Sequence, residues 1–198
     1  MSLSRYIRYS AVLALAGAAL SLTTGCASAV DKNEVVNTAN PVKGLHAEIQ
    51  TKEAAEKNAI KWSSYEDALT AARKDGKFVM VDFYATWCKW CKKLDTETYP
   101  DPRVVEALKA DFIVVKIDSE SSDKVVHEMR QMSKAELATA YEVSSYPAVW
   151  FLDKDGKKAK LLKGFLPADD FLVYLKYIKS GAYKTTEFED YAKKGGGK

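Results

Sequence analysis

Two cysteines, Cys88 and Cys91, stand three residues apart directly after an apolar segment, residues 78–84. The segment is typical of a buried strand, so the cysteines are expected where a strand gives way to a helix. Free backbone N–H groups at a helix start, together with nearby lysines, lower the pKa of Cys88 below its free value of roughly 8.5. Two thiols at this spacing can close into a disulfide and reopen. We expect Cys88 to be the nucleophile and Cys91 to resolve the mixed disulfide.

A pair of cysteines at this spacing is also half of a typical zinc site. Such a site needs two further Cys or His ligands at recognisable spacing. The sequence has one other cysteine, Cys26, and two isolated histidines, His46 and His127. The ligand count therefore favours redox chemistry over a structural metal, and we expect neither a metal nor a cofactor.

Asp82 lies six residues before Cys88, inside the apolar segment. Low dielectric disfavours a charged carboxylate, so burial would raise the pKa of Asp82. Such a group could accept the proton of Cys91 and return it while a mixed disulfide is resolved. The alternative is a structural aspartate, hydrogen-bonded at a strand position. The proton-relay role is favoured because an unpaired buried carboxylate is otherwise costly.

The order of strands and helices expected over residues 59–181 predicts an α/β domain, with a mixed sheet covered by helices on both faces. The capping box Ser63-Ser-Tyr-Glu66 predicts a helix that ends near Gly76. Residues 123–142 are expected to be helical, with Ser133 dividing two helices. The remaining predicted elements are the cysteine helix ending before Pro100, a helix from 101 to about 109, a strand over 112–118, a hairpin over 148–165 and a helix over 168–178.

Three features in this order resemble the thioredoxin superfamily: the segment Val81-Asp-Phe-Tyr-Ala-Thr-Trp-Cys-Lys-Trp-Cys91, the segment Ser145-Tyr-Pro147, and Gly164. The stretch over 77–104 is similar to exported thioredoxin-like proteins and to the C-terminal periplasmic domain of transmembrane thiol:disulfide interchange proteins. The resemblance covers about residues 60–178. It implies a thioredoxin fold in which the predicted helical segment is an insert before the strand that follows a cis proline.

The resemblance also implies roles for the residues around the two thiols. Pro147 would be the cis proline that faces the pair, and Tyr146 would bind an extended substrate through its backbone and shape selectivity. Trp87 resembles the family tryptophan that touches partners. Trp90 replaces a small residue or proline and makes the rim of the site more apolar.

A further implied feature is a lysine that faces the buried carboxylate from the neighbouring strand. Alignment on the family pattern puts Val114 at that position, with Lys116 out of phase. This alignment predicts that a relay through Asp82 works through water.

The N-terminal residues 1–25 have the layout of a bacterial export signal. Arg5 and Arg8 precede an apolar stretch over 11–22, and no acidic residue occurs before Asp31. The segment ending at Cys26 resembles a lipoprotein signal, whose cysteine is lipidated. Ordinary cleavage after residues 27–29, leaving Val30 first, is the alternative. We favour lipidation at Cys26 and a membrane-anchored periplasmic protein; both outcomes export the chain.

Residues 26–58 are predicted to be a linker, and residues 182–198 a C-terminal tail whose first part docks through Tyr183, Phe188 and Tyr191. Removal of the signal leaves 28 basic and 27 acidic residues of the original 30 and 27. A nearly neutral chain with no basic stripe offers no electrostatic site for nucleic acid.

Together these features predict an exported thiol:disulfide oxidoreductase. The residues near the thiols favour a reductant over an oxidant, supplied with electrons by a membrane or periplasmic donor and acting on protein thiols and disulfides. One alternative is a protein that handles copper(I), or assembles cytochromes or oxidases, with the same thiol pair; no Met or His flanks it. A non-catalytic interaction module is a third reading, which two intact cysteines disfavour. Residues 118–134 suit a solvated helix or a surface for a specific partner.

Overall fold

The computed structural model describes residues 59–196 of the chain. The predicted signal and the Cys26 lipidation site therefore lie outside the described residues. The elements, in chain order, are α2 (Tyr65–Asp75), β1 (Phe78–Tyr84), α3 (Lys89–Lys93), the π-helical turn η1 (Leu94–Thr98), α4 (Pro102–Asp111), β2 (Phe112–Asp118), β3 (Lys124–His127), β4 (Arg130–Ser133), α5 (Lys134–Ala140), β5 (Ala148–Leu152), β6 (Lys158–Lys163), α6 (Ala168–Lys179), the 3₁₀ turn η2 (Ala182–Lys184) and α7 (Phe188–Lys193).

A four-stranded sheet with the order β2-β1-β5-β6 forms the centre of the domain. β1 pairs in parallel with β2, whereas the β1–β5 and β5–β6 pairs are antiparallel. The prediction of a mixed sheet is confirmed. β1 lies in the middle of the sheet, and its five inner residues, 79–83, are all buried, as expected for a strand covered on both faces.

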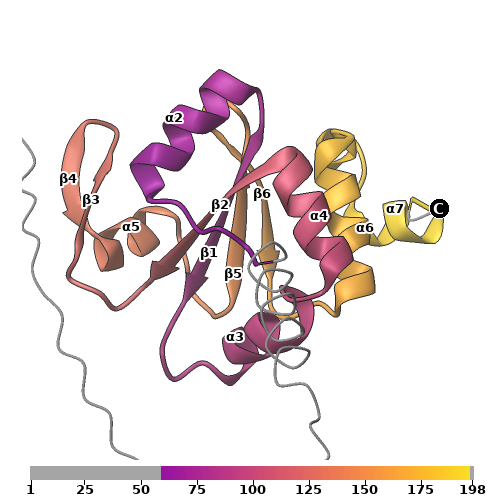
Figure 1. The fold of residues 1–198 in the computed structure, drawn as a ribbon, viewed down its shortest axis with the longest axis horizontal. Helices are drawn as coiled ribbons and strands as arrows, with labels where there is room; N and C mark the ends of the chain where they lie inside the picture. The colour runs from indigo at the N-terminus through magenta and orange to yellow at the C-terminus, as the bar shows by residue number, and fades with distance from the viewer. Residues whose placement is uncertain (1–58, 197–198) are drawn as a thin grey trace, which may run out of the picture. The chain divides into compact units, whose positions relative to one another are not determined.

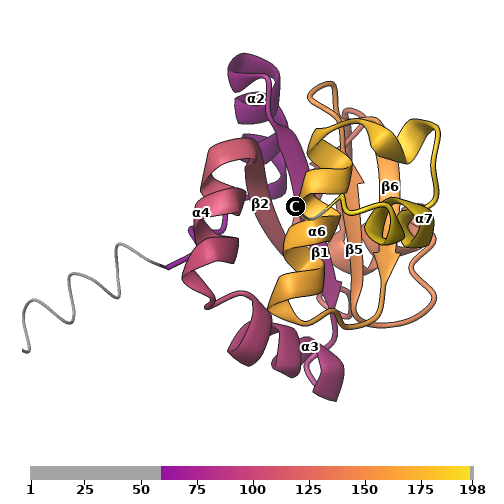
Figure 2. The same ribbon diagram turned by 90° about the vertical axis from the view of Figure 1, so that its right-hand side faces the viewer.

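Helices cover both faces of the sheet (Figure 1). On one face, α2 and α5 pack with the β3–β4 hairpin over Val79, Val81 and Phe83 of β1. On the other, α4 and α6 pack over Met80 (Figure 2). Because side chains alternate along a strand, Asp82 points to the same face as Met80. The polar residue of the central strand is thus placed on the α4–α6 side.

Residues 124–133 form a β-hairpin, so the predicted helix over this part of the insert is wrong. Val125 pairs with Met132 across the two strands, and both side chains join the core under α2. The turn places Glu128 and Met129 at φ 50° and 62°, a backbone geometry typical of the tight turns that connect hairpins. The predicted cap at Ser133 is correct, because Ser133 and Glu136 form a capping box at the start of α5.

The start of α2 also differs from the prediction. Ser64, one residue later than expected, accepts the hydrogen bond from the Asp67 N–H and caps the helix. Ser63 instead extends the sheet edge through a bridge to Val115. The helix ends as predicted, with Gly76 as its C-cap in the left-handed region.

The first part of the C-terminal segment is folded against the domain. Tyr183, Phe188 and Tyr191 pack on the core cluster under α6, as predicted. Phe188 lies against both Tyr174 and Tyr177 of α6, with ring centroids 4.7 and 5.6 Å away. Within residues 59–196, no helix is long and apolar enough to cross a membrane.

Candidate active site

Cys88 and Cys91 form a disulfide at the junction of β1 and α3. Cys88 is the N-cap of α3, and its sulfur accepts a hydrogen bond from the Cys91 N–H at 3.1 Å. Both cysteines are nearly covered, with 4% and 3% of their surface exposed. Similar burial means that exposure does not distinguish the two sulfurs. The cap position of Cys88 and its N–H donor do, because each favours negative charge on that sulfur.

Tyr146 and Pro147 lie beside the pair. The Tyr146–Pro147 peptide bond is cis, as predicted, and Tyr146 packs against the small cluster formed by Ala85 and the two cysteines. Within residues 59–196, the backbone N–H and C=O of Tyr146 take part in no hydrogen bond. The chain next to the disulfide therefore keeps a free backbone donor and acceptor, which an extended peptide can use.

Trp87 and Trp90 are the large exposed side chains at the site, with 64% and 56% of their surface accessible. Trp87 stacks edge-on against Tyr146, with ring centroids 5.8 Å apart, and its indole N–H donates to Glu120 at 2.9 Å. Glu120 follows β2 and lies in the segment over residues 118–134, for which the sequence left two interpretations open. No sequence signal pointed to it, because the contact joins residues 33 positions apart.

Asp82 is 1% exposed and sits on the central strand. The pKa of Asp82 is raised to about 7, chiefly by burial; Asp95 also raises it, while Lys116 and the Tyr99 hydroxyl lower it. The Tyr99 hydroxyl is near enough to act on the Asp82 pKa, but the two groups do not meet the geometry of a full hydrogen bond. The carboxyl group is therefore poised to exchange a proton near neutral pH.

Lys116 faces Asp82 directly, so the predicted alignment with Val114 at this position is wrong. The parallel register pairs Asp82 with Lys116 and Met80 with Val114, two residues away from the expected pairing. Lys116 Nζ lies 3.9 Å from Asp82 Oδ2 and also forms an ion pair with Asp95. A relay through Asp82 thus has a cation beside it, rather than water alone.

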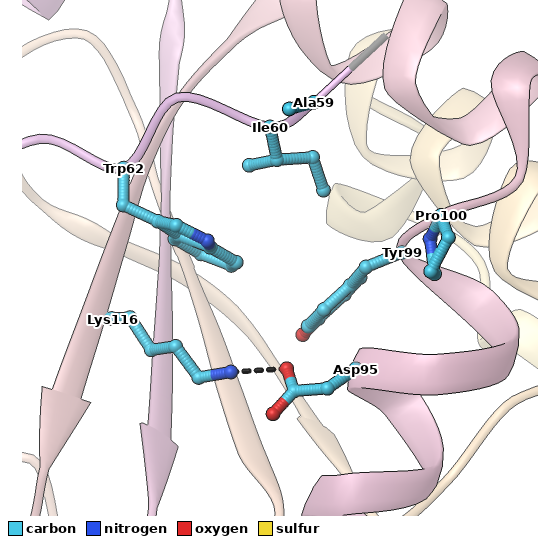
Figure 3. A pocket seen from close by; sticks show the side chains of 7 residues that line it. All are labelled: Ala59, Ile60, Trp62, Asp95, Tyr99, Pro100 and Lys116. Atoms are coloured by element: carbon cyan, nitrogen blue, oxygen red, sulfur yellow. Dashed lines mark hydrogen bonds and ion pairs between the residues drawn. The ribbon is translucent and has the colours of Figure 1, made fainter. Parts of the chain in front are cut away.

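A pocket of about 580 Å³ leads to this group of charges. In Figure 3, the rings of Trp62 and Tyr99 face the pocket from opposite sides, and the ion pair of Lys116 with Asp95 lies below them. Trp62, Tyr84 and Tyr99 surround the Lys116 ammonium at 5.1 to 5.8 Å from their ring centroids. Asp95 was missed from the sequence, although its place four residues after Cys91 on the same helical segment was a usable signal.

In the part of the chain that the structure describes, no group of three or more His, Cys, Asp or Glu side chains could hold a metal ion. His127, one of the candidate ligands considered for zinc, instead bonds to the Tyr65 hydroxyl through Nδ1 at 2.9 Å and packs on Tyr141. It anchors the β3–β4 hairpin to α2, away from the cysteines.

Comparison of the sequence with known proteins identifies the family to which the chain belongs. The thioredoxin-like domain family matches residues 65–179. The thiol:disulfide interchange protein DsbD of Pseudoalteromonas atlantica is 31% identical over 116 residues, which cover 58% of this chain and 18% of that protein. The disulfide bond reductase DsbH of Chlamydia pneumoniae is 28% identical over 132 residues, covering 66% of this chain and 77% of that protein. The chain thus spans about a fifth of the length of the DsbD relatives it matches.

Solved structures agree with the family on the fold. A thioredoxin-fold protein from Helicobacter pylori superposes with a TM-score of 0.51 at 27% identity, covering 61% of this chain and 80% of that one. A thioredoxin from Thermus thermophilus gives 0.50 at 29% identity, covering 61% and 88%. The predicted thioredoxin fold is confirmed, and the chain belongs to the thioredoxin-like domain family.

Proposed function

We propose that this chain is an exported thiol:disulfide oxidoreductase that reduces disulfides in partner proteins. The observation that carries the proposal is the Cys88–Cys91 disulfide at the start of α3, next to the free backbone of Tyr146, with an exposed tryptophan immediately before each cysteine. This arrangement combines a reversible two-electron group with a surface that can hold a peptide.

The reaction begins from the reduced pair. The Cys88 thiolate attacks one sulfur of a substrate disulfide, so that a Cys88–substrate bond forms, the substrate S–S bond breaks, and the first substrate thiolate leaves and takes a proton. Cys91 then loses its proton, attacks the Cys88 sulfur and displaces the second substrate thiolate. Two electrons pass to the substrate and the protein becomes the disulfide form. A dithiol donor protein restores the reduced pair by the same exchange in reverse.

Asp82 is the proposed acceptor of the Cys91 proton. Its burial and its pKa of about 7 support this role, since a base with that pKa can take up a proton and release it near neutral pH. Lys116 stabilises the charged form of Asp82 and Asp95 opposes it. Burial is the largest cause of the raised pKa, and the balance between these two neighbours adjusts the pH at which the relay works.

The direction of electron flow is supported by a relative and by the residues at the site. The DsbH relative is a disulfide bond reductase by name. Between the cysteines this chain has Lys89 and Trp90, with no histidine to make the Cys88 thiol strongly acidic. A moderately acidic thiol leaves the disulfide comparatively stable, which favours a reductant.

Export and anchoring at Cys26 are also part of the proposal, and they rest on the sequence of residues 1–30. Intact mass of protein extracted from membranes would test them. Fatty acyl groups on Cys26 support a lipoprotein, whereas an unmodified chain that begins at Val30 would rule out the anchor and keep the export.

Trapping tests the central chemistry. Cys91→Ser should accumulate mixed disulfides with substrates in the exported compartment, because Cys88 can still attack but nothing resolves the product. Cys88→Ser is the matched control and should trap none. Equal trapping by both single variants would contradict the assigned order, and no trapping by either would contradict the oxidoreductase itself. Mass spectrometry of the trapped partners would identify the substrates.

A further inference from the structure

Two aromatic pairs involve the residues that immediately precede the two cysteines. Trp87 with Tyr146 forms the first. Trp90 with Phe165 forms the second, with ring centroids 5.7 Å apart and the ring planes at 34°. Phe165 reaches the site because it directly follows Gly164, whose N–H donates to the Pro147 carbonyl at 2.9 Å. The residue after β6 is thus fixed beside the cis proline.

The second pair carries a positive charge. Lys93 Nζ lies 4.7 Å from the centroid of the Phe165 ring and 5.3 Å from that of Trp90. We name these three residues, Trp90, Phe165 and Lys93, the Trp90 shelf. The ammonium group lies over both rings and makes an exposed ion pair with Glu97 at 3.6 Å. A surface pair of this kind contributes little, about 0–1 kcal/mol, so Lys93 remains able to bind another anion.

The helix α3 that carries Trp90 and Lys93 has two further lysines, and the acidic neighbour Glu97 pairs with Lys93. In the described part of the chain, the exposed residues Lys89, Lys92 and Lys163 form no ion pair. The nearby Asp95 is committed to Lys116. A partner that approaches this side of the disulfide therefore meets a basic surface with an aromatic centre.

The exposure of Trp90 argues that the shelf is not simply part of the core. More than half of the Trp90 surface is accessible, although a buried tryptophan would contribute far more to stability. A large aromatic ring that stays exposed next to a reactive disulfide is typical of a residue that contacts a partner.

We infer that the Trp90 shelf selects substrates with an aromatic and an acidic residue next to the reactive cysteine. The inference rests on the proposed function and adds the class of substrate. The aromatic side chain packs on Trp90 and Phe165, and the carboxylate pairs with Lys93 Nζ. The free backbone of Tyr146 holds the peptide without regard to sequence, so the shelf supplies the discrimination.

Peptide disulfides test this directly. Two symmetric disulfides are needed, one of the peptide Glu-Phe-Cys-Phe-Glu and one of Lys-Phe-Cys-Phe-Lys, so that the flanking residues are the same on both sides of the cysteine. The readout is the ratio of their reduction rates by the reduced protein, each normalised to hydroxyethyl disulfide. When this ratio is compared between the wild type and a variant, differences in the intrinsic reactivity of the two peptides cancel. Lys93→Glu is the test variant, and Lys92→Glu is its control, one residue away with the same change of charge.

The wild-type protein should reduce the acidic peptide faster. In Lys93→Glu the ratio should fall by about tenfold or reverse, whereas in Lys92→Glu it should change by less than about threefold. An unchanged ratio in Lys93→Glu would overturn the inference. An equal change in the two variants would also overturn it, because such a result would reflect the overall charge of the helix and not a contact of the peptide with Lys93. If wild-type protein reduces neither the peptides nor hydroxyethyl disulfide, the proposed function fails and the inference fails with it.

The aromatic part of the shelf has its own test. A third peptide, Glu-Ala-Cys-Ala-Glu, differs from the acidic peptide by its two Phe residues. The wild-type protein should prefer the Phe peptide, and Trp90→Ala should lose most of that preference while keeping the preference for Glu over Lys. A preference for Phe that survives in Trp90→Ala would show that the ring is bound elsewhere.

Discussion

Lys116 and Asp82 face each other across the β1–β2 pair, with Lys116 Nζ 3.9 Å from Asp82 Oδ2. Lys116 is held in place by Asp95 from the cysteine helix. One cation therefore lies between two carboxylates, of which Asp82 is buried and Asp95 is partly exposed. The charge of Asp82 therefore depends on Lys116 of β2 and on Asp95 of η1. Each of these two residues can be substituted separately.

The first prediction uses the opposite signs of these two neighbours. Lys116→Met should raise the pKa of Asp82 above about 7, because it removes the cation that stabilises the carboxylate. Asp95→Asn should lower that pKa, because it removes a like charge and frees Lys116. Carbon-13 NMR of the Asp82 carboxyl group as a function of pH measures both shifts. Shifts of the same sign in the two variants would contradict the arrangement.

The second prediction concerns the proton transfer. Asp82→Asn should slow resolution of the mixed disulfide by at least about tenfold at pH 7, because Cys91 loses its proton acceptor. The first step, attack by Cys88, should keep its rate. Stopped-flow measurement of both steps separates them, and the rate of the first step is the internal control. Equal slowing of the two steps would mean that Asp82 acts on the fold or on Cys88 instead.

The third prediction concerns stability and its dependence on pH. The native state keeps Asp82 protonated up to about pH 7, whereas the unfolded chain releases that proton near pH 3.8. Between these values the unfolded state binds fewer protons, so this group makes the wild type less stable as pH rises, by up to about 1.4 kcal/mol per pH unit. Asp82→Asn removes the effect. Urea unfolding of the oxidised proteins should show the variant gaining on the wild type from pH 5 to pH 8, and a constant difference would argue against a raised pKa.

The fourth prediction is the reduction potential of the Cys88–Cys91 couple. A reductant with a moderately acidic Cys88 should have a potential near about −270 mV, well below the roughly −120 mV of a strong oxidant. Equilibration against glutathione redox buffers, followed by alkylation and mass spectrometry, gives the value. A potential close to that of the oxidant would remove the reductase assignment and leave the thioredoxin fold and the thiol pair unaffected.

The fifth prediction concerns Glu120, which holds the exposed Trp87 by a hydrogen bond of 2.9 Å. Glu120→Ala should lower kcat/KM for protein disulfides up to about tenfold, the value of one such bond, because Trp87 is no longer oriented against Tyr146. Glu120→Gln keeps an acceptor oxygen and should restore most of the loss. Reduction of hydroxyethyl disulfide should change little in Glu120→Ala. A loss equal for small and protein substrates would indicate damage to the disulfide itself.

Local patterns were sufficient for most of the elements. The uninterrupted apolar run over 78–84 predicted β1, and Asp101-Pro102 predicted the start of α4, where Asp101 caps the helix. The order of these elements, with the cysteine pair and Pro147, predicted the family and the cis peptide bond. The patterns of the single elements depend on residues within about ten positions of one another, and the family resemblance depends on the order in which these local motifs follow along the chain.

The β3–β4 hairpin shows where such patterns fail. Glu128 and Met129 occupy the turn at positive φ, where Asn or Gly is usual, so no turn signal was present. The strands are short, and Val125 and Met132 become core residues because α2 covers them. Packing against a distant helix, rather than local preference, makes this segment a hairpin.

The sequence by itself determined the redox pair, the buried carboxylate and the fold that carries them, because each has a local pattern of polarity and spacing. The tertiary structure decided which charges meet. The register of β1 against β2 put Lys116 opposite Asp82, the path of the chain after β2 brought Glu120 to Trp87, and the end of β6 brought Phe165 to Trp90. A shift of two residues in strand pairing changes no side chain's face, so the hydrophobic pattern of the sequence could not choose between these registers.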